Sequence, residues 1–571
     1  MEAKNNTAAV AARPALITER LREHAQRTPE RLAYTFLRDD GKIDEITYGD
    51  LARRASGLAA ILAERAAPGA RALLFYPAGL EFIAVYFACL LAGLIAVPST
   101  IPHKTRASRR LKALLDDAEP ALILTRSDCE SAITASLSLV EAPSRPCLST
   151  DTLVLSDRVA PLPQPTASTV AFLQYTSGST ALPKGVEITH LNIASNVESI
   201  REGFGFTADT VMVSWLPLFH DMGLIGSVVS PMYVGFHCVL MAPAAFLKNP
   251  VMWLDAISTY RGTCAGAPNF GWDYCAKKIS DAQKERLDLR HLVVAYNGSE
   301  PIRADTLRRF FAAFAHCGMR ETSMFPCYGM AETTLFVAGG PLDSAPRIRS
   351  VSKSLLEGNQ IRDAHPDDVD AREIVSSGRI ASSATVRIVD PETCLPVSGQ
   401  RVGEVWVSGP SVARGYWNRP AESAQVFGAC LADSGEGPFL RTGDLAFMRD
   451  GELFVTGRLK DLIIINGRNV YPQDVEEVIE RSIDFIEPNM CAAFSVEIDS
   501  QERLAIVAEA NRSLVRAAQQ LAKDNVSKAE QLRAQDDYLS KIEAMAHNIC
   551  HVIGQQFDVS VSSIVFVKPG T

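Results

Sequence analysis

Apolar and polar residues alternate with two different periods along the first 330 residues. Residues 15–26 have apolar positions at the spacing of one helix face. Short apolar or β-branched runs at residues 32–36, 43–47 and 71–76 are typical of strands. Thr47 opens a motif that resembles a helix capping box, so we expect a helix directly after it. This alternation predicts an α/β sheet.

The most apolar stretch, residues 82–97, stops at Pro98. It is shorter than the roughly 20 residues that a membrane-spanning helix needs. We therefore expect a buried core helix and no membrane span. The start of the sequence also lacks the long apolar core of a signal peptide.

The pattern changes to strands from residue 384 onward. Strand-like runs at residues 385–389, 403–408, 439–442 and 453–456 predict a β-subdomain. The short charged segment 458–461 precedes a mixture of strands and helices. The sequence thus predicts a large N-terminal domain (1–457), a boundary at residues 458–461 and a small α+β C-terminal domain (462–571).

Composition narrows the class of protein. The 571 residues are too many for one ordinary core, so we expect two or more domains. The net charge is −9 and no basic block is present, which argues against nucleic-acid binding. Twelve cysteines occur without a C-x-x-C pair, which favours reduced thiols in the cytoplasm.

A strand–loop–strand pattern at residues 170–190 contains the most suggestive polar loop. Its residues are Thr176, Ser177, Gly178, Ser179, Thr180 and, after Pro183, Lys184. Hydroxyl and backbone N–H groups can surround phosphate oxygens, and a lysine adds a positive charge. The loop enters a strand, unlike a Walker A loop, which opens a helix. A flexible Ser/Thr-rich connector explains the same composition.

Further polar loops follow predicted strands, where ligands gather in α/β sheets. They contain His220, Asn297, Gly298, Ser299, Glu300, Tyr328, Gly329, Met330 and Glu332. Several of the candidate residues also have an ordinary structural explanation. Glu332 suits a helix start, His220 and Tyr328 suit a core, and Asp444 after Thr-Gly suits a turn.

The order of these motifs resembles the acyl-adenylate-forming superfamily over residues 15–571. The resemblance rests on the loop at 176–185, Glu332 after Tyr-Gly, Thr442-Gly443-Asp444, and Arg458-x-Lys460. It implies an ATP-dependent ligase that joins a carboxylate to AMP and releases pyrophosphate. Both reactants are anionic, so such a site must neutralise charge and align the attack.

The resemblance also implies a role for each motif. The loop from Thr176 to Lys184 would hold the β- and γ-phosphates of ATP, and Glu332 would hold Mg²⁺. Tyr328 would stack on adenine beside Asn297 to Glu300. Asp444 and Arg458 would bind the ribose, and His220 would lie where acyl chain and phosphate meet. Residues 458–461, with Lys460, would be the hinge on which a mobile C-terminal domain swings.

Three segments resemble one branch of this superfamily, the fatty acyl-AMP ligases. They are residues 297–301, 409–417 and 469–474. The long stretch after Glu332 fits that branch's insertion, at about residues 351–374, which restrains the small domain. The branch passes a fatty acyl group to the phosphopantetheine thiol of an acyl carrier protein for lipid, polyketide or lipopeptide synthesis.

Met222, Leu224, Ile225 and Met232 are candidates for the fatty acyl tunnel, although such residues are also typical of a plain core. Two alternative functions stay open. One is a fatty acyl-CoA synthetase, and the other is a non-catalytic nucleotide- or acyl-binding scaffold.

The sequence departs from the family pattern at its end. The resemblance implies a catalytic lysine in a Thr-Ser-Ser-Gly-Lys-like motif after a Lys-Pro-Gly-like segment. The printed sequence ends at Thr571, and Lys568 lies too early to be that lysine. We therefore expect slow adenylation by the chain as printed.

Overall fold

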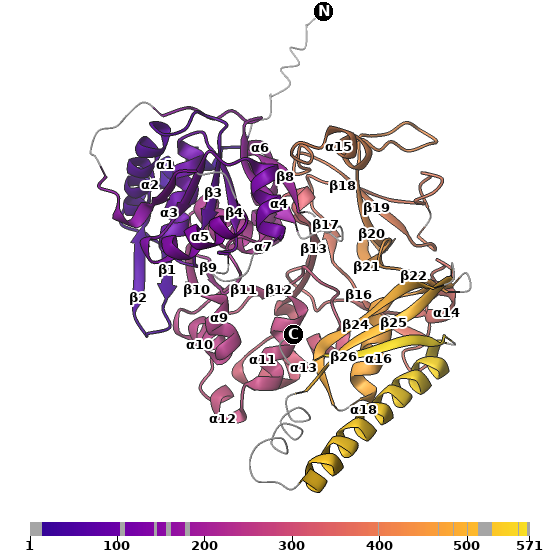
Figure 1. Ribbon diagram of the computed structural model, residues 1–571. Helices are drawn as coiled ribbons and strands as arrows, with labels where there is room; N and C mark the ends of the chain where they lie inside the picture. Colours follow the sequence, from indigo (N-terminus) through magenta and orange to yellow (C-terminus); the bar gives the residue numbers. More distant parts are fainter. Residues whose placement is uncertain are drawn as a thin grey trace, which may run out of the picture.

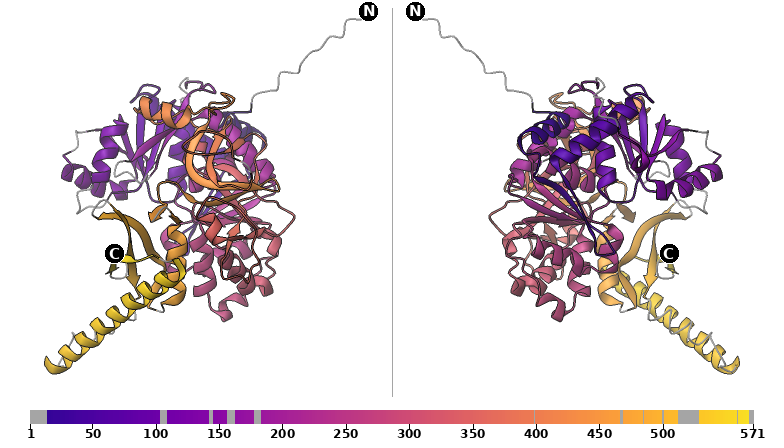
Figure 2. Two further views of the ribbon diagram at one scale, coloured as in Figure 1. Left: turned by 90° about the vertical axis from the view of Figure 1, so that its right-hand side faces the viewer. Right: turned by 90° about the vertical axis from the view of Figure 1, so that its left-hand side faces the viewer.

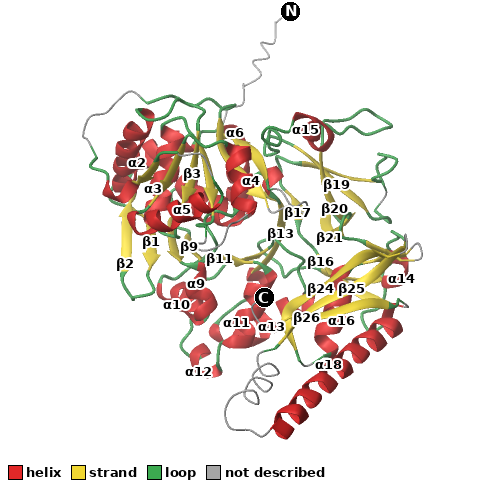
Figure 3. Cartoon of the chain, in the orientation of Figure 1, coloured by secondary structure: helices red, strands yellow, loops and turns green. Residues whose placement is uncertain are grey.

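Two large β-sheets with helices packed against them make up most of the structure (Figures 1 and 2). The computed structural model describes residues 14–102, 109–141, 145–155, 162–176, 183–397, 399–465, 468–483, 485–498, 501–511, 528–557 and 559–567. Figure 3 shows helices and strands interleaved through most of the molecule, so the predicted α/β class is confirmed.

The first sheet has six strands in the order β6-β5-β3-β4-β7-β8. They are β3 (Arg71–Phe75), β4 (Ile95–Ser99), β5 (Leu122–Thr125), β6 (Cys147–Ser149), β7 (Val170–Thr176) and β8 (Lys184–Thr189). All neighbouring pairs are parallel except β7 and β8, which are antiparallel. This hairpin places Thr176 and Lys184, the two ends of the predicted phosphate loop, at one edge of the sheet.

The second sheet has thirteen strands in the order β18-β19-β20-β21-β17-β14-β13-β12-β11-β9-β10-β1-β2. They are β1 (Leu32–Leu37), β2 (Ile43–Thr47), β9 (Val211–Ser214), β10 (His237–Met241), β11 (Cys264–Ala267), β12 (Val294–Asn297), β13 (Met324–Gly329), β14 (Phe336–Gly339), β17 (Arg379–Ile380), β18 (Thr385–Val389), β19 (Gly403–Ser408), β20 (Leu440–Arg449) and β21 (Glu452–Arg458). Its central strands β9 to β13 are parallel, and the strands from β14 to β18 pair antiparallel.

Helices cover both sheets. They are α1 (Ile17–Arg27), α2 (Tyr48–Ala63), α3 (Leu80–Leu91), α4 (Arg109–Ala118), α5 (Ser127–Leu139), α6 (His190–Gly203), α7 (Asp221–Leu224), α8 (Ser230–Val234), α9 (Pro243–Lys248), α10 (Val251–Thr259), α11 (Asn269–Lys278), α12 (Asp281–Lys284), α13 (Ala304–Phe314) and α15 (Pro420–Phe427). The side chain of Thr47 caps α2 by accepting from the Asp50 N–H at 3.1 Å, as its motif predicts.

Helix α3 is buried at every position from Phe82 to Leu91. A helix that is apolar on every side belongs in a protein core or a membrane, and here it packs in the main hydrophobic cluster. In the described part of the chain, no helix combines the length and apolarity needed to cross a bilayer.

The predicted β-subdomain consists of β18 to β21 with α15 between β19 and β20. Its inward side chains form hydrophobic clusters separate from the main one. Hydrogen bonds through β17 and β14 nevertheless join these strands to the large sheet. The weakly periodic stretch before it has structure of its own: β15 (Ile348–Ser352), α14 (Lys353–Leu356) and β16 (Ala371–Val375).

The C-terminal part has its own sheet and core. Its elements are β22 (Ile463–Ile465), β23 (Arg468–Val470), α16 (Pro472–Ser482), β24 (Ile486–Ile498), β25 (Gln501–Ala510), α18 (Lys528–Phe557) and β26 (Val561–Val567). Apolar residues of α16 and α18 pack with those of β24 and β25 in one cluster. This is the α+β composition that the sequence predicts, and the domain boundary at 458–461 stays a prediction.

Phe310→Ala tests how tightly the core around α13 is packed. Phe310 is fully buried, and its ring centroid lies 4.7 Å from those of Trp272 and Phe314. We expect a loss of about 3–5 kcal/mol, because truncation removes transfer free energy and leaves a cavity. Urea unfolding followed by circular dichroism measures it. Leu247→Ala, at a half-exposed position, is the control, and an equal loss there would contradict the prediction.

Candidate active site

The hairpin β7–β8 positions the only lysine of the predicted phosphate loop. Thr176 ends β7 and pairs across the hairpin with Lys184, which begins β8. Residues 177–182, which include Ser177, Gly178, Ser179 and Thr180, lie outside the described residues. Thr176 and Lys184 therefore mark the two ends of the loop.

Residues 415–417 pair with the outer edge of β8. The Trp417 N–H donates to the Gly185 carbonyl at 2.8 Å, and the Glu187 N–H donates to the Gly415 carbonyl at 2.9 Å. Tyr416 forms a bridge pair with Val186. This pairing brings the Tyr416 side chain beside the lysine, although more than 200 residues separate them in the sequence.

Two acidic side chains meet Lys184 and Tyr416. The Lys184 ammonium lies 5.3 Å from the Tyr416 ring centroid and forms an ion pair with Glu422 of α15. The Tyr416 hydroxyl donates to Glu332 Oε1 at 2.9 Å. The phosphate-loop lysine and the predicted metal carboxylate thus share one tyrosine.

Glu332 lies in a tight turn after β13. A side chain at Gly329 would place its Cβ 1.7 Å from the Leu335 carbonyl oxygen, so only glycine allows this turn. The carboxylate is 9% exposed, and burial raises the pKa of Glu332. The hydrogen bond from Tyr416 opposes that shift. Met330, next to the glycine, donates its N–H to the same carbonyl at 2.9 Å.

The surroundings of Glu332 suit a hard cation shared with phosphate. Mg²⁺ in nucleotide sites is commonly held by one or two carboxylates together with substrate phosphates. Asp221 is close enough to raise the pKa of Glu332 further, and Arg458 is close enough to lower it. Among the described residues, no three His, Cys, Asp or Glu side chains form a metal-binding group by themselves.

Asp444 joins two other predicted nucleotide residues. It is 4% exposed and accepts from the Tyr328 hydroxyl at 2.7 Å and from Arg458 Nε at 2.8 Å. The carboxylate also raises the pKa of Arg458. The Thr442 hydroxyl accepts from the Asp444 N–H at 3.0 Å and fixes the turn. Tyr328, Asp444 and Arg458 form one connected group.

The segment Asn297 to Glu300 follows β12 and lies against β13. A Cβ at Gly298 would come within 2.9 Å of Cys327 Sγ, so this close approach requires glycine. Ser299 has a φ of +69° and donates to Met222 Sδ at 2.9 Å. Glu300 instead accepts from the Phe270 N–H at 2.6 Å, at the start of α11. Glu300, which the resemblance places beside adenine, thus contacts the protein backbone.

Asn297 is fully buried, and its Nδ2 lies 3.5 Å from Asn269 Oδ1. Its own Oδ1 has no hydrogen-bond partner within the described part of the chain. A buried amide oxygen without a donor is costly. The Asn297 Oδ1 is therefore an unused acceptor at the end of β12.

His220 precedes α7 and is about half exposed. Its Nδ1 lies 2.6 Å from Asp221 Oδ1, and this hydrogen bond raises the pKa of His220 although burial lowers it. The neighbouring Phe219 carbonyl accepts from Gln174 Nε2 of β7 at 2.9 Å. This bond ties the histidine segment to the strand that leads into the phosphate loop.

The predicted hinge follows β21 directly. The Leu459 N–H donates to the Gly443 carbonyl at 2.8 Å, next to Asp444. Lys460 is exposed. Lys568 and the three residues after it lie outside the described residues, so the structure leaves the expectation about the terminal lysine untested.

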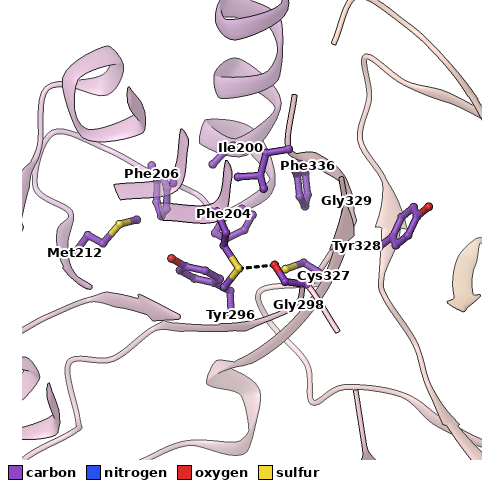
Figure 4. Close-up of a pocket in the computed structure, with 14 residues that line it drawn as sticks. Ile200, Phe204, Phe206, Met212, Tyr296, Gly298, Cys327, Tyr328, Gly329 and Phe336 are labelled. Carbon is purple, nitrogen blue, oxygen red and sulfur yellow. Dashed lines mark hydrogen bonds between the residues drawn. The ribbon is translucent and has the colours of Figure 1, made fainter. Parts of the chain in front are cut away.

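An apolar pocket with an empty volume of about 490 Å³, its mouth included, lies beside these motifs (Figure 4). It is lined by Ile200, Phe204, Phe206, Met212, Met222, Gly226, Tyr296, Gly298, Ser299, Cys327, Tyr328, Gly329, Leu335 and Phe336. Of the four tunnel candidates, Met222 lines this pocket. Leu224, Ile225 and Met232 are buried in the main core but do not line it.

The segment 351–374 contacts the C-terminal part at several points. Lys353 Nζ donates to the Gln556 carbonyl at 3.1 Å and lies 3.5 Å from the Phe557 ring centroid. Arg468 donates to Glu357 Oε2 at 2.6 Å. Further contacts at the same interface are Asn469 to Asn359 (3.1 Å) and Arg372 to Asp474 (3.0 Å).

Sequence reasoning missed Tyr416, Glu422 and most of the pocket lining as site residues. Tyr416 lies in residues 409–417, a segment that had marked the family branch without a role in the site. Phe204, Phe206 and Met212 occur in or beside ordinary apolar runs. Only the pairing of distant strands reveals that they face the site.

Comparison with known proteins shows similarity to enzymes that bind AMP and to fatty acid ligases. The profile of the AMP-binding enzyme family matches residues 21–417. The medium-chain-fatty-acid–[acyl-carrier-protein] ligase JamA of Moorena producens is 38% identical over 95% of this chain and 89% of its own. The putative fatty-acid–CoA ligase FadD21 of Mycobacterium tuberculosis is 34% identical over 96% and 94%, respectively.

A solved structure is similar over nearly the whole chain. The fatty acyl-adenylate ligase from L. pneumophila, in complex with acyl adenylate and pyrophosphate, has a TM-score of 0.75 and 33% identity. The similarity covers 97% of this chain and 93% of that one. The arrangement of both sheets is therefore that of an adenylate-forming enzyme.

Glu332→Gln should stabilise the protein without nucleotide at neutral pH. The pKa of Glu332 is raised in the folded protein. The stability that Glu332 contributes in its protonated form is therefore fully present below its pKa in the unfolded chain. That stability is lost as pH rises through the pKa in the folded protein. The neutral amide avoids that loss. We expect a higher thermal midpoint than wild type at about pH 7.5 and convergence near about pH 4.5.

Differential scanning fluorimetry across this pH range measures the effect. Glu392→Gln, at an exposed position, is the matched control and should show no such trend. A lower midpoint for Glu332→Gln at neutral pH would show that the ionised carboxylate stabilises the fold.

Proposed function

The chain belongs to the AMP-binding enzyme family, and we propose that within it the protein is a fatty acyl-AMP ligase. The observation that carries this proposal is that two groups of contacts lie beside one apolar pocket: Lys184 and Glu332 both contact Tyr416, and Asp444 contacts Tyr328 of the pocket lining. Tyr416 links the first two residues, and Arg458 lies near both Glu332 and Asp444.

In the proposed reaction, a fatty acid carboxylate attacks the α-phosphorus of ATP, and the bond to the pyrophosphate leaving group breaks. Lys184 and the ends of its loop would neutralise the β- and γ-phosphates, because phosphoryl transfer needs positioning and charge compensation more than covalent help. Asp444 would accept hydrogen bonds from the ribose hydroxyls. Mg²⁺, held by Glu332, would supply further positive charge when bound.

The pocket suits the acyl chain. It begins at the nucleotide motifs, where Gly298, Ser299 and Gly329 line it, and continues among Phe204, Phe206 and Met212. An apolar cavity that opens at a polar reaction centre suits an amphiphile whose charged end must react. Figure 4 shows Tyr328 directed away from these aromatic rings, and its hydroxyl donates to Asp444.

We further propose that the acceptor is the phosphopantetheine thiol of an acyl carrier protein. The thiol would attack the acyl carbon, and AMP would leave. JamA, whose name includes an acyl carrier protein, is similar over nearly the whole chain. The contacts of segment 351–374 with residues 468–557 support a role in restraining the C-terminal part.

A fatty acyl-CoA ligase is the second candidate, because FadD21 carries that name at 34% identity. We also propose a cytoplasmic location for the protein. All twelve cysteines are free thiols in the structure, which fits a reducing compartment.

The acceptor can be decided in a competition assay. Protein, Mg·ATP and labelled fatty acid are offered equal amounts of CoA and pantetheinylated carrier protein, and mass spectrometry follows the products. We expect the acylated form of the carrier protein as the main product. The apo carrier, which lacks the pantetheine thiol, is the negative control. Preferential acyl-CoA would favour the second candidate, and no acid-dependent ATP–pyrophosphate exchange would favour a binding scaffold.

Asp444→Asn should weaken use of ATP. The amide loses the charge that holds Arg458 and would hold the ribose, and a hydrogen bond to a charged group contributes about 1.5–3 kcal/mol. We expect the KM for ATP to rise by about 10-fold to 100-fold in fatty acid-dependent exchange. Asp433→Asn, at an exposed position in the same part of the chain, should leave the KM unchanged. An unaltered KM in Asp444→Asn would remove this aspartate from the nucleotide site.

A further inference from the structure

Glu422 is an acidic residue next to a site that must bind several negative charges. It lies in the first turn of α15 and forms an ion pair with Lys184. The Lys184 side chain is 20% exposed and that of Glu422 is 32% exposed. A carboxylate in this position opposes phosphate binding, so its presence needs a physical reason.

The helix holds Glu422 firmly in place. The Ser423 hydroxyl accepts from the Tyr416 N–H at 2.8 Å and donates to the Arg419 carbonyl at 2.7 Å. The Tyr416 and Phe427 rings also meet at 5.1 Å between centroids. The start of α15 is thereby fixed to the same segment that pairs with β8, so Glu422 and Lys184 keep their relative positions.

The Lys184 ammonium has three N–H donors. Its partners are Glu422, the Tyr416 ring and, in the proposed reaction, phosphate. Without phosphate, its ammonium lies between Glu422 and the face of Tyr416, whose hydroxyl binds Glu332. When phosphate binds, the same ammonium must share its charge between the phosphate oxygens and Glu422. A lysine is a compact charge on a flexible stem, so it can exchange one partner for another.

We infer that Glu422 is a positioning residue that acts as an exchangeable counter-ion of Lys184. It holds the ammonium beside Tyr416 when phosphate is absent and competes with pyrophosphate for it. This competition lowers the affinity of the site for pyrophosphate and favours pyrophosphate release. The inference rests on the proposed function, in which Lys184 contacts the β- and γ-phosphates.

The test is equilibrium binding of Mg·pyrophosphate to the full chain, measured by isothermal titration calorimetry. Because removal of the competing charge frees Lys184, we expect Glu422→Gln and Glu422→Ala to bind about 3-fold to 10-fold more tightly than wild type. Glu422→Asp keeps the charge and should stay nearer wild type. Glu436→Gln, which removes the partner of Arg387 in an exposed pair, is the matched control and should bind as wild type does.

A double-mutant cycle separates this inference from simple repulsion. The gain from Glu422→Gln should largely disappear in a Lys184→Met background. A gain that persists there, or unchanged or weaker binding in a folded Glu422→Gln variant, would overturn the inference. Acid-dependent exchange by the wild-type protein tests the proposed function separately, because exchange shows whether the protein forms an adenylate whatever the effect of Glu422 on pyrophosphate affinity.

Discussion

The hydrogen bond from the Tyr416 hydroxyl to Glu332 joins the two large sheets at the candidate site. Tyr416 belongs to a segment paired with β8 of the six-stranded sheet, and Glu332 follows β13 of the thirteen-stranded sheet. The Ala413 N–H also donates to the Glu332 carbonyl at 2.8 Å. This joint places the phosphate-loop lysine and the buried carboxylate around one tyrosine.

The site holds its charges at a cost to the fold. Glu332 and Asp444 are almost completely buried, and a buried carboxylate is unfavourable unless it is hydrogen-bonded or paired. Each accepts from a tyrosine hydroxyl, and Asp444 is also paired with Arg458. These partners hold the carboxylates in fixed geometry before any ligand arrives, and preorganised charge is what an adenylation site requires.

The polar motifs and the apolar pocket depend on the same backbone. Gly298 and Gly329 each occupy a position where a Cβ would collide with β13 or with the turn that follows it, and both line the pocket. The close approach of β12 and β13 therefore shapes the nucleotide motifs and the acyl pocket together. This arrangement would place a reactive carboxylate where the apolar cavity meets the phosphates.

The sequence by itself determined the α/β class, the strands β1 and β2, the cap of α2, the buried helix α3 and the order of the nucleotide motifs. These features depend on local periodicity and on short motifs, which a single chain displays directly. Only the tertiary structure decided that Tyr416 and Glu422 meet Lys184, that Glu300 binds backbone, and that the pocket is lined by Phe204 and its neighbours. Such contacts join residues tens to hundreds of positions apart, and strand pairing, which local pattern does not encode, brings them together.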